Sequence, residues 1–304
     1  MGTRPLNGAS PRRSVPAWLP AAAAATTGIQ VGAAIVATRF VIDQTHPASL
    51  ALMRYAIGFI CFLPPLLMSP QIRFERRDLA PLALLGITQF GILIALLNFG
   101  LNYIPAGRAA LIFATFPLLT MILASWLGHE RLGATKVLGV LLTIAGVGLA
   151  LGEKSVADGG AAHEWFGALA VFASALSGAL CSVFYRPYLR KYPALEVSAF
   201  AMLASVGFLA ILAAGEGFFD ALPRFTMGGW LAIVFIGVGS GIGYYLWLWA
   251  LSRATATRVT VFLALSPVTA SGLGVVLLGE RLTLMPLLGL VCVAAGLVVA
   301  HRLP

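Results

Sequence analysis

The sequence predicts an all-α integral membrane protein with ten transmembrane helices, and three observations support this fold class. Apolar residues make up 60% of the 304 residues and charged residues only 10%, against about 25% in a soluble domain. The mean hydropathy is +0.93. Apolar runs of the roughly 20 residues needed to cross a bilayer recur along the chain. This composition excludes a disordered chain, a nucleic-acid-binding protein and an ordinary soluble enzyme.

Ten such runs follow one another with short loops between them. We expect helices over 18–42, 47–68, 79–101, 107–127, 132–151, 165–188, 194–214, 228–250, 255–277 and 283–301. The first run follows Arg12-Arg13, a pair that also precedes the apolar part of export signals. Because the apolar stretch continues to Ile42 and further spans follow, we interpret it as the first helix behind a basic cytoplasmic tail over 1–17.

The distribution of basic residues predicts the orientation of these helices. Cytoplasmic loops of membrane proteins carry an excess of Lys and Arg. With a cytoplasmic N-terminus, fourteen of the twenty basic residues fall on the inner side, five on the outer side, and Arg54 within a span. Both termini are therefore expected in the cytoplasm, with the lipid bilayer of the cell inner (plasma) membrane as the surrounding medium. The net charge of +9 is explained by the excess of basic residues in the cytoplasmic loops, so no nucleic acid is expected as a partner.

An internal repeat divides the chain into two halves. Residues 101–150 align without a gap onto 251–300, and rare residue types coincide in one register: Arg108 with Arg258, Pro117 with Pro267, and Glu130 with Glu280. We expect one five-helix repeat over 18–151, a loop over 152–164 and a second repeat over 165–304. Because five is an odd number, the second repeat crosses the membrane inverted relative to the first. Inverted repeats enclose a central site in many secondary transporters.

Several motifs resemble a known family. Glu130-Arg131-Leu132 and Glu280-Arg281-Leu282 close the fourth and ninth spans, and the first two spans carry Gly32, Arg39, Pro47 and Arg54 in the family's spacing. With this pattern, which covers about residues 20–300, the chain resembles the drug/metabolite transporter (DMT) superfamily, and within it the EamA family of bacterial exporters. Val31 and His129 depart from the family's usual Trp and Gly, and Val31 weakens any substrate carried over from the family. The resemblance implies alternating-access export of small metabolites, often amino acids. It also implies a cavity lined by spans one, three, four, six, eight and nine.

Polar and aromatic residues within the spans are the candidates for substrate binding: Gln30, Arg54, Gln89, Asn98, Ser177, Tyr244 and Trp247. An Arg inside the membrane is costly and functional by default. Arg54 either faces a cavity, where it could hold a carboxylate, or extends to the headgroups. Tyr244 and Trp247 share a helix face with Ser240. That face either contacts substrate or belongs to the interfacial aromatic belt.

Two prolines are candidate hinges. Pro117 and Pro267 lie in the middle of repeat-equivalent spans, where a proline removes a helical hydrogen bond and kinks the helix. The freed carbonyl could face a cavity. The alternative is a static packing kink.

Four charges at span ends are candidate gates. Arg108 and Arg258 are expected at helix N-termini, where the helix dipole disfavours a cation. We hypothesise two symmetry-related ion pairs, Arg108 with Glu280 outside and Arg258 with Glu130 inside, that close alternate gates. The alternative is that each charge marks the level of the lipid headgroups.

Absent motifs narrow the function further. No carboxylate falls in the middle of a span, the four histidines lie in loops or at the terminus, and the three cysteines lie apart in apolar runs. The phosphate-binding Gly-x-x-x-x-Gly-Lys-Ser/Thr pattern is missing. We therefore expect no metal, no cofactor and no enzyme activity, with a membrane-embedded enzyme as the less favoured alternative to a transporter. We expect a small-molecule substrate that is exported either by facilitated or by proton-coupled transport. Amino acids are favoured over drugs, nucleosides or sugars, and oligomeric state stays open.

Overall fold

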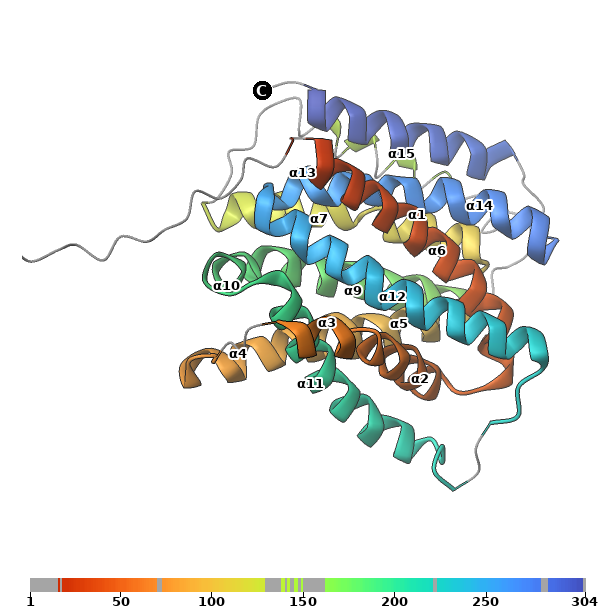
Figure 1. Cartoon of the computed structure of the whole chain (residues 1–304). Coiled ribbons are helices and arrows are strands. Elements are labelled where there is room, and N and C mark those ends of the chain that lie inside the picture. The colour runs from red at the N-terminus through yellow and green to blue at the C-terminus, as the bar shows by residue number, and fades with distance from the viewer. Residues whose placement is uncertain are drawn as a thin grey trace, which may run out of the picture.

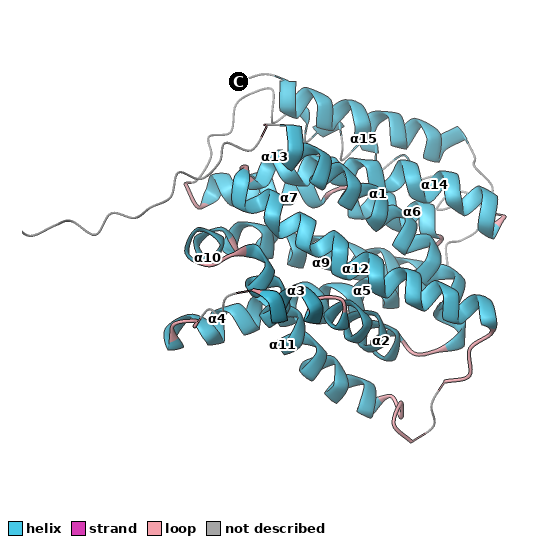
Figure 2. Ribbon diagram, viewed as in Figure 1, coloured by secondary structure: helices cyan, strands magenta, loops and turns pink. Residues whose placement is uncertain are grey.

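A computed structural model describes residues 16, 18–69, 73–128, 138–139, 141–142, 145–146, 149, 162–220, 223–279 and 284–302. Within these ranges all regular structure is helical (Figures 1 and 2). Eight stretches of the described chain are long and apolar enough to cross a membrane. The chain is thus a multi-pass membrane protein. The predicted fifth span, 132–151, falls mostly outside the described residues.

The first half begins with long helices that are interrupted at defined points. Its elements in chain order are α1 (Trp18–Val41), the 3₁₀ turn η1 (Ile42–Gln44), α2 (Pro47–Ile60), α3 (Leu63–Met68), α4 (Arg76–Gly86), the π-helical turn η2 (Ile87–Ile92), α5 (Leu93–Leu101), α6 (Ala106–Phe113) and α7 (Phe116–Trp126). Pairs of these elements form single predicted spans, such as α6 with α7.

The second half has the same character. Its elements are α9 (Ala162–Phe184), α10 (Arg186–Lys191), α11 (Ala194–Gly215), α12 (Met227–Arg253), α13 (Ala256–Thr260), the 3₁₀ turn η3 (Val261–Ala264), α14 (Leu265–Leu278) and α15 (Leu284–Arg302). The ends of the eight spans agree with the predicted ends to within three residues, because the length of each apolar run sets where the helix leaves the hydrocarbon. The helix α9 starts inside the predicted 152–164 loop.

The two candidate hinge prolines lie in the middle of their spans, as expected, but each at the start of a helix that follows an interruption of the span. Pro117 is the second residue of α7 and Pro267 the third residue of α14. Each follows a break in its span, after Phe113 in one half and across η3 in the other. Proline is tolerated in the first turn because its missing N–H has no helical partner there. The prolines therefore mark where each span restarts.

Elements from the two halves pack against each other. The helix α1 packs along α12 and α14, α2 lies between α11 and α12, and α9 packs against α5, α6 and α7. Figure 1 shows α1 and α12 side by side, with α15 at one edge of the bundle. Gly32 permits the contact of α1 with α14, since a Cβ at this position would collide with the Ser266 carbonyl.

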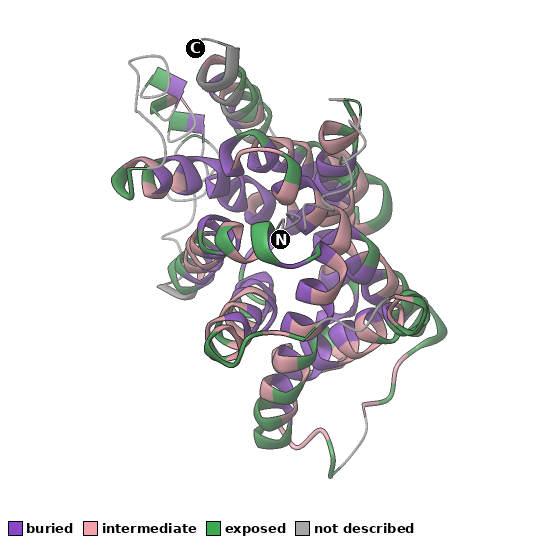
Figure 3. Ribbon diagram, turned by 60° about the vertical axis from the view of Figure 1, so that its left-hand side comes forward, coloured by how far each residue is buried: buried purple, intermediate pink, exposed green. Residues whose placement is uncertain are grey.

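Burial follows the membrane setting. Buried residues face the interior of the bundle in Figure 3, and exposed residues face outward. Large apolar side chains are among the most exposed, including Leu67, Trp126 and Ile211. Such exposure would be unfavourable in water but suits the hydrocarbon of a bilayer, where apolar side chains are solvated by lipid.

A carboxylate at one end of the bundle connects two helices. Glu216, expected in a loop, is the C-cap of α11. Its Oε1 accepts a hydrogen bond from the Ala48 N–H at 3.0 Å, and its Oε2 accepts from the Ser49 N–H and Oγ, both at 2.7 Å. These groups form the first turn of α2, whose unpaired N–H groups and positive dipole end favour an anion.

Candidate functional site

The candidate site is a small cavity inside the bundle, with a volume of about 80 Å³, between α1, α2, α12 and the segments around η2, α6 and η3. Its polar lining consists of Thr27, Gln30, Arg54, Gln89, Ser240 and Tyr244. Its apolar lining includes Val31, Tyr55, Phe90, Phe113, Phe116, Trp247 and Leu263. Both halves of the chain contribute to these walls.

Arg54 is the one charged residue among the described lining residues. Its side chain is buried, with 7% of the residue exposed. The Nε group donates a hydrogen bond to Ser240 Oγ at 2.6 Å, and the guanidinium carbon lies 5.4 Å from the centre of the Tyr55 ring. Neither contact neutralises the charge. No described lining residue is a carboxylate, and a buried cation of this kind favours binding of an anion.

Two amides beside Arg54 have unused hydrogen-bonding atoms. Gln30 Nε2 and Gln89 Oε1 are buried, and within the described part of the chain neither atom has a hydrogen-bond partner. A buried polar atom without a partner costs free energy, about 1–3 kcal/mol. The cavity therefore offers one amide donor and one amide acceptor that water or a ligand would satisfy.

Aromatic rings form a connected part of the lining, which we call the aromatic wall. The Phe90 ring centre lies 4.8 Å from that of Tyr55 and 4.1 Å from that of Tyr244, in edge-to-face arrangements. Phe116 and Trp247 form a second edge-to-face pair at 6.0 Å. This wall suits an apolar or aromatic group of a ligand.

The π-helical turn η2 positions two lining residues. Gln89 and Phe90 both lie within η2, and both face the cavity. Single π turns inside α-helices occur frequently at functional sites. Sequence reasoning identified Gln89 by its polarity. Phe90 and Tyr55 carried no comparable signal, since they are aromatic residues in apolar spans.

An ion pair joins the halves at one end of the bundle. Arg108 Nη1 lies 2.6 Å from Glu164 Oε2, and the two side chains are 11% and 35% exposed. Glu164 lies in the first turn of α9, where a carboxylate is favoured by the helix dipole. It also compensates the unfavourable position of Arg108 at the start of α6.

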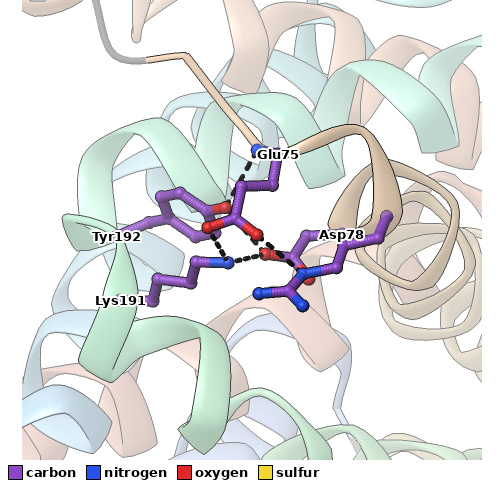
Figure 4. Close-up of polar contacts among 5 residues, drawn as sticks. Glu75, Asp78, Lys191 and Tyr192 are labelled. Atoms are coloured by element: carbon purple, nitrogen blue, oxygen red, sulfur yellow. Dashed lines mark hydrogen bonds and ion pairs between the residues drawn. The ribbon is translucent and has the colours of Figure 1, made fainter.

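Charged residues also join the halves at the opposite end (Figure 4). Lys191 Nζ, at the end of α10, lies 2.6 Å from Glu75 Oε1 and 2.6 Å from Asp78 Oδ2. Tyr192 donates its hydroxyl proton to Asp78 at 2.7 Å, and its hydroxyl oxygen accepts from the Glu75 N–H at 3.0 Å. The Lys191 hydrogen bond, followed by the Arg77 charge, holds the pKa of the Glu75 carboxyl below its usual value of 4.5. Glu75 and Asp78 lie between the predicted second and third spans, and nothing in the sequence indicated this cluster.

Comparison with known proteins identifies the family. The model of the EamA-like transporter family matches residues 18–152 and, separately, residues 165–301. The chain belongs to the EamA-like transporter family. The chain is therefore a transporter of the cell inner membrane. Its multi-pass architecture agrees with this assignment.

Individual EamA-like relatives cover most of the chain. An uncharacterized transporter of Archaeoglobus fulgidus is 28% identical over 89% of this chain and 94% of its own length. A protein of Salmonella typhimurium named as a probable amino-acid metabolite efflux pump is 31% identical over 77% of this chain and 85% of its own length. A protein of Streptantibioticus cattleyicolor named as a probable terminal-alkyne amino-acid exporter is 29% identical over 60% of each chain. One crystal structure shares the fold, with a TM-score of 0.71 and 23% identity over 92% of this chain and 99% of the other.

Five of the seven substrate-binding candidates of this EamA-like chain lie around one cavity: Gln30, Arg54, Gln89, Tyr244 and Trp247. Two lie elsewhere. Asn98 is buried and its Nδ2 donates to the Pro47 carbonyl at 3.0 Å, which ties α5 to the start of α2. Ser177 Oγ donates to the Ala173 carbonyl of its own helix at 2.9 Å.

The set of lining spans differs from the one that the EamA resemblance implied. Span two lines the cavity through Arg54 and Tyr55, whereas span six does not contribute a described lining residue. The helix α9 lies behind the wall instead. Its Gly178 packs against Phe116 and Leu93, two lining residues, so closely that a Cβ would overlap the Phe116 ring.

The hinge prolines Pro117 and Pro267 are not among the lining residues of this cavity, but residues close to them in sequence are. Phe113 and Leu263, the residues four positions before Pro117 and Pro267, are repeat-equivalent and both line the cavity. The two span breaks therefore meet at the site.

Among the described residues, Arg108 has Glu164 as an ion-pair partner, and the Arg108–Glu280 pairing expected from the repeat stays a prediction. Arg258 is exposed at the start of α13, where its N–H donates to Thr255 Oγ1. Glu130 and Glu280, the partners expected for the two arginines, lie outside the described residues. Within the described chain, no group of three His, Cys, Asp or Glu side chains could hold a metal ion.

Proposed function

We propose that this chain exports small metabolites, most of all amino acids, across the plasma membrane by alternating access. The observation that carries the proposal is the buried, uncompensated charge of Arg54 in a cavity that both halves line. A carboxylate would bind Arg54 and the Ser240 hydroxyl. The unused amide atoms of Gln30 and Gln89 would bind further polar groups, and the aromatic wall would cover the side chain.

The names of two relatives favour amino acids over other substrates. They are given as an amino-acid metabolite efflux pump and as a terminal-alkyne amino-acid exporter. Drugs, nucleosides and sugars are the alternative substrates. Since most of them lack a carboxylate, they would leave the Arg54 charge uncompensated, which makes them the second choice.

The architecture that we propose has ten spans in two inverted repeats, 18–151 and 165–304, with a 1–17 tail, a 152–164 loop and both termini in the cytoplasm. Two features support it. The family model matches each half separately. The fourth and ninth spans also break at repeat-equivalent positions, just before Pro117 and Pro267. In this arrangement the breaks act as hinges beside the substrate.

Gates at both ends complete the cycle. In the proposed topology Arg108 and Glu164 close the outer end, and Lys191 with Glu75 and Asp78 closes the inner end. The Lys191–Glu75 pair is the more exposed, at 33% and 47%, and an exposed ion pair contributes little free energy, about 0–1 kcal/mol, so that it can open and close in each cycle. Arg258, Glu130 and Glu280 form the remaining gate charges of the proposal.

The lining also bears on energy coupling. None of the described lining residues is a carboxylate or a histidine. Proton-driven carriers commonly use such groups within the membrane. This favours facilitated export down a concentration gradient over proton antiport.

Counterflow in liposomes tests the proposal. The purified chain would be reconstituted into liposomes, and the liposomes would be loaded with an unlabelled amino acid. Uptake of labelled amino acids, nucleosides and sugars into these liposomes would then be measured with and without a pH gradient. We expect saturable amino-acid exchange that the gradient does not change. Exchange of nucleosides or sugars alone would refute the amino-acid assignment, and exchange that requires the gradient would refute facilitated export.

A further inference from the structure

A second hollow lies on the outer surface of the bundle, away from the central cavity. It is an apolar groove of about 460 Å³ between α1, α12 and α14. Small residues are prominent in its lining, with Ala33 and Ala37 on α1 and Ala232 on α12, beside the larger Phe235 and Leu277. From Ala33 to Phe40 the helix advances by seven residue steps, or roughly 10 Å of rise. The groove has the length and chemistry for part of an acyl chain.

The groove ends at a polar pocket. This pocket, of about 490 Å³, is lined by Arg39, Asp43, Tyr103 and Glu164, and Phe40 and Leu278 line both hollows. An apolar channel therefore passes directly into a polar one at the end of α1. Such a change of polarity over a short distance matches a lipid, which has an apolar chain and a polar headgroup.

The charges of the pocket are mixed. Arg39 Nη1 lies 3.4 Å from Asp43 Oδ2, one helical turn away, and the two side chains are 32% and 77% exposed. At 3.4 Å this is a long, open pair with capacity for other partners. A cation and an anion side by side are complementary to a zwitterion, in which an anionic phosphate is followed by an ammonium group.

We propose that this combined site binds a phospholipid with an amine headgroup, such as phosphatidylethanolamine. Arg39 binds the phosphate, Asp43 binds the ammonium group, and one acyl chain occupies the groove over Ala37 and Ala232. The assignment of the lipid to the outer leaflet rests on the topology proposed above. The binding itself does not depend on which substrate is transported.

The position of the site gives the lipid a role. Since α1 belongs to the first half and α12 and α14 to the second, the bound lipid contacts both halves at once. The relative movement of the halves would change the shape of the groove. The lipid is thus expected to alter the rate of transport, while substrate affinity stays with Arg54.

Native mass spectrometry of the purified, full chain tests the site. The chain would be taken from nanodiscs of equal phosphatidylethanolamine and phosphatidylglycerol, and the lipid retained after detergent removal of the annulus would be identified. We expect one phosphatidylethanolamine per chain. Arg39→Gln should lower its retention about tenfold or more, since it removes a charge-assisted contact. Ala232→Leu, which fills the groove, should do the same.

Matched variants control for general effects. Arg224→Gln changes another exposed arginine at the same end of the bundle, and Ala214→Leu enlarges an exposed alanine of α11 outside the groove. Both should retain the lipid as the unmodified chain does. The headgroup preference of the unmodified chain is a second measurement that needs no variant to fold.

Three outcomes would overturn the proposal. One is equal retention of the two lipids, and another is equal loss in Arg39→Gln and Arg224→Gln. The third is displacement of phosphatidylethanolamine by a transported amino acid, which would make the polar pocket a substrate subsite. Because retention is measured without transport, failure of the lipid site and failure of the export function would be seen separately.

Discussion

Replacing Arg54 by Gln tests whether its charge recognises a substrate carboxylate. Arg54 is 7% exposed and is held by one hydrogen bond to Ser240. A hydrogen bond to a charged group contributes about 1.5–3 kcal/mol. At 1.4 kcal/mol for each tenfold change, the loss corresponds to a rise in KM of about 10- to 100-fold.

Ser240→Ala provides a graded counterpart. It keeps the Arg54 charge but removes the group that orients it, 2.6 Å from Nε. Because the charge stays in the cavity and only its orientation is lost, we expect a smaller rise in KM of roughly 2- to 12-fold. The assay is liposome counterflow of an amino acid and of its amide, which keeps the side chain and the ammonium group but lacks the carboxylate.

The comparison of acid and amide decides the result. If Arg54 binds the carboxylate, Arg54→Gln should raise the KM of the acid and leave that of the amide within about twofold. The thermal unfolding midpoint of each variant in detergent would show that it folds. An equal rise for acid and amide would refute the reasoning, because the residue would then act on packing or on conformational change.

The remaining predictions concern stability, packing and pH. Glu216→Ala should lower the free energy of unfolding by about 1–3 kcal/mol, because it removes the acceptor for the first turn of α2, and the thermal midpoint would measure this. Gly178→Ala should raise KM about three- to tenfold, since its Cβ would displace the Phe116 ring, whereas Gly207→Ala, with no atom within 4 Å of its Cβ, should leave KM unchanged. Lys191→Met should increase hydrogen exchange at the start of α4. In the unmodified chain that protection should persist from neutral pH down to pH 5 and be lost only as the pH falls through the lowered pKa of Glu75, because a carboxylate with a depressed folded pKa stabilises the fold above its unfolded pKa.

Each of these has a control and a contrary outcome. Glu216→Gln retains one acceptor oxygen and should lose less stability than Glu216→Ala, and equal losses would argue against capping. Arg190→Met changes the exposed neighbour of Lys191 and should leave exchange at α4 as it was. Loss of protection already at pH 6 would contradict the role assigned to Glu75.

The sequence predicted the membrane spans well because the bilayer imposes a single strong constraint. A run of apolar residues must be about 20 residues long to cross it, and this length can be counted directly. The sequence indicated the interruptions within helices less clearly than it indicated the spans. Pro117 and Pro267 indicated that a break exists, but their place in the first turn depends on how the neighbouring spans pack.

The candidate site was predictable where a residue was unusual for its surroundings. Arg54, Gln30 and Gln89 are polar residues in apolar spans, and all three line the cavity. Phe90 and Tyr55 resemble many other aromatic residues of a membrane helix, so only their positions in space assign them to the wall. Asn98 shows the converse limit, since a polar residue in a span can serve a neighbouring backbone carbonyl instead of a ligand.

The ion pairs at the bundle ends could not be predicted because they join residues far apart in the chain. Arg108 and Glu164 are separated by 56 positions, and Asp78 and Lys191 by 113. The repeat offered symmetry as the only guide to pairing, and symmetry assigned Glu280 to Arg108. Glu164, at the start of α9, is the partner that the described residues show for Arg108, and the repeat gave no indication of it.

The glycines of α12 have a consequence for how substrate specificity could evolve. Gly237 and Gly241 lie against α2, and Gly239 and Gly243 lie against the side chain of Gln30 on α1. A larger residue at any of the four would push neighbouring backbone or Gln30 out of place. Mutation of this helix can therefore explore new substrates mainly at Ser240, Tyr244 and Trp247. Relatives that diverged in cargo would be expected to differ at those three positions while the glycines between them stay fixed.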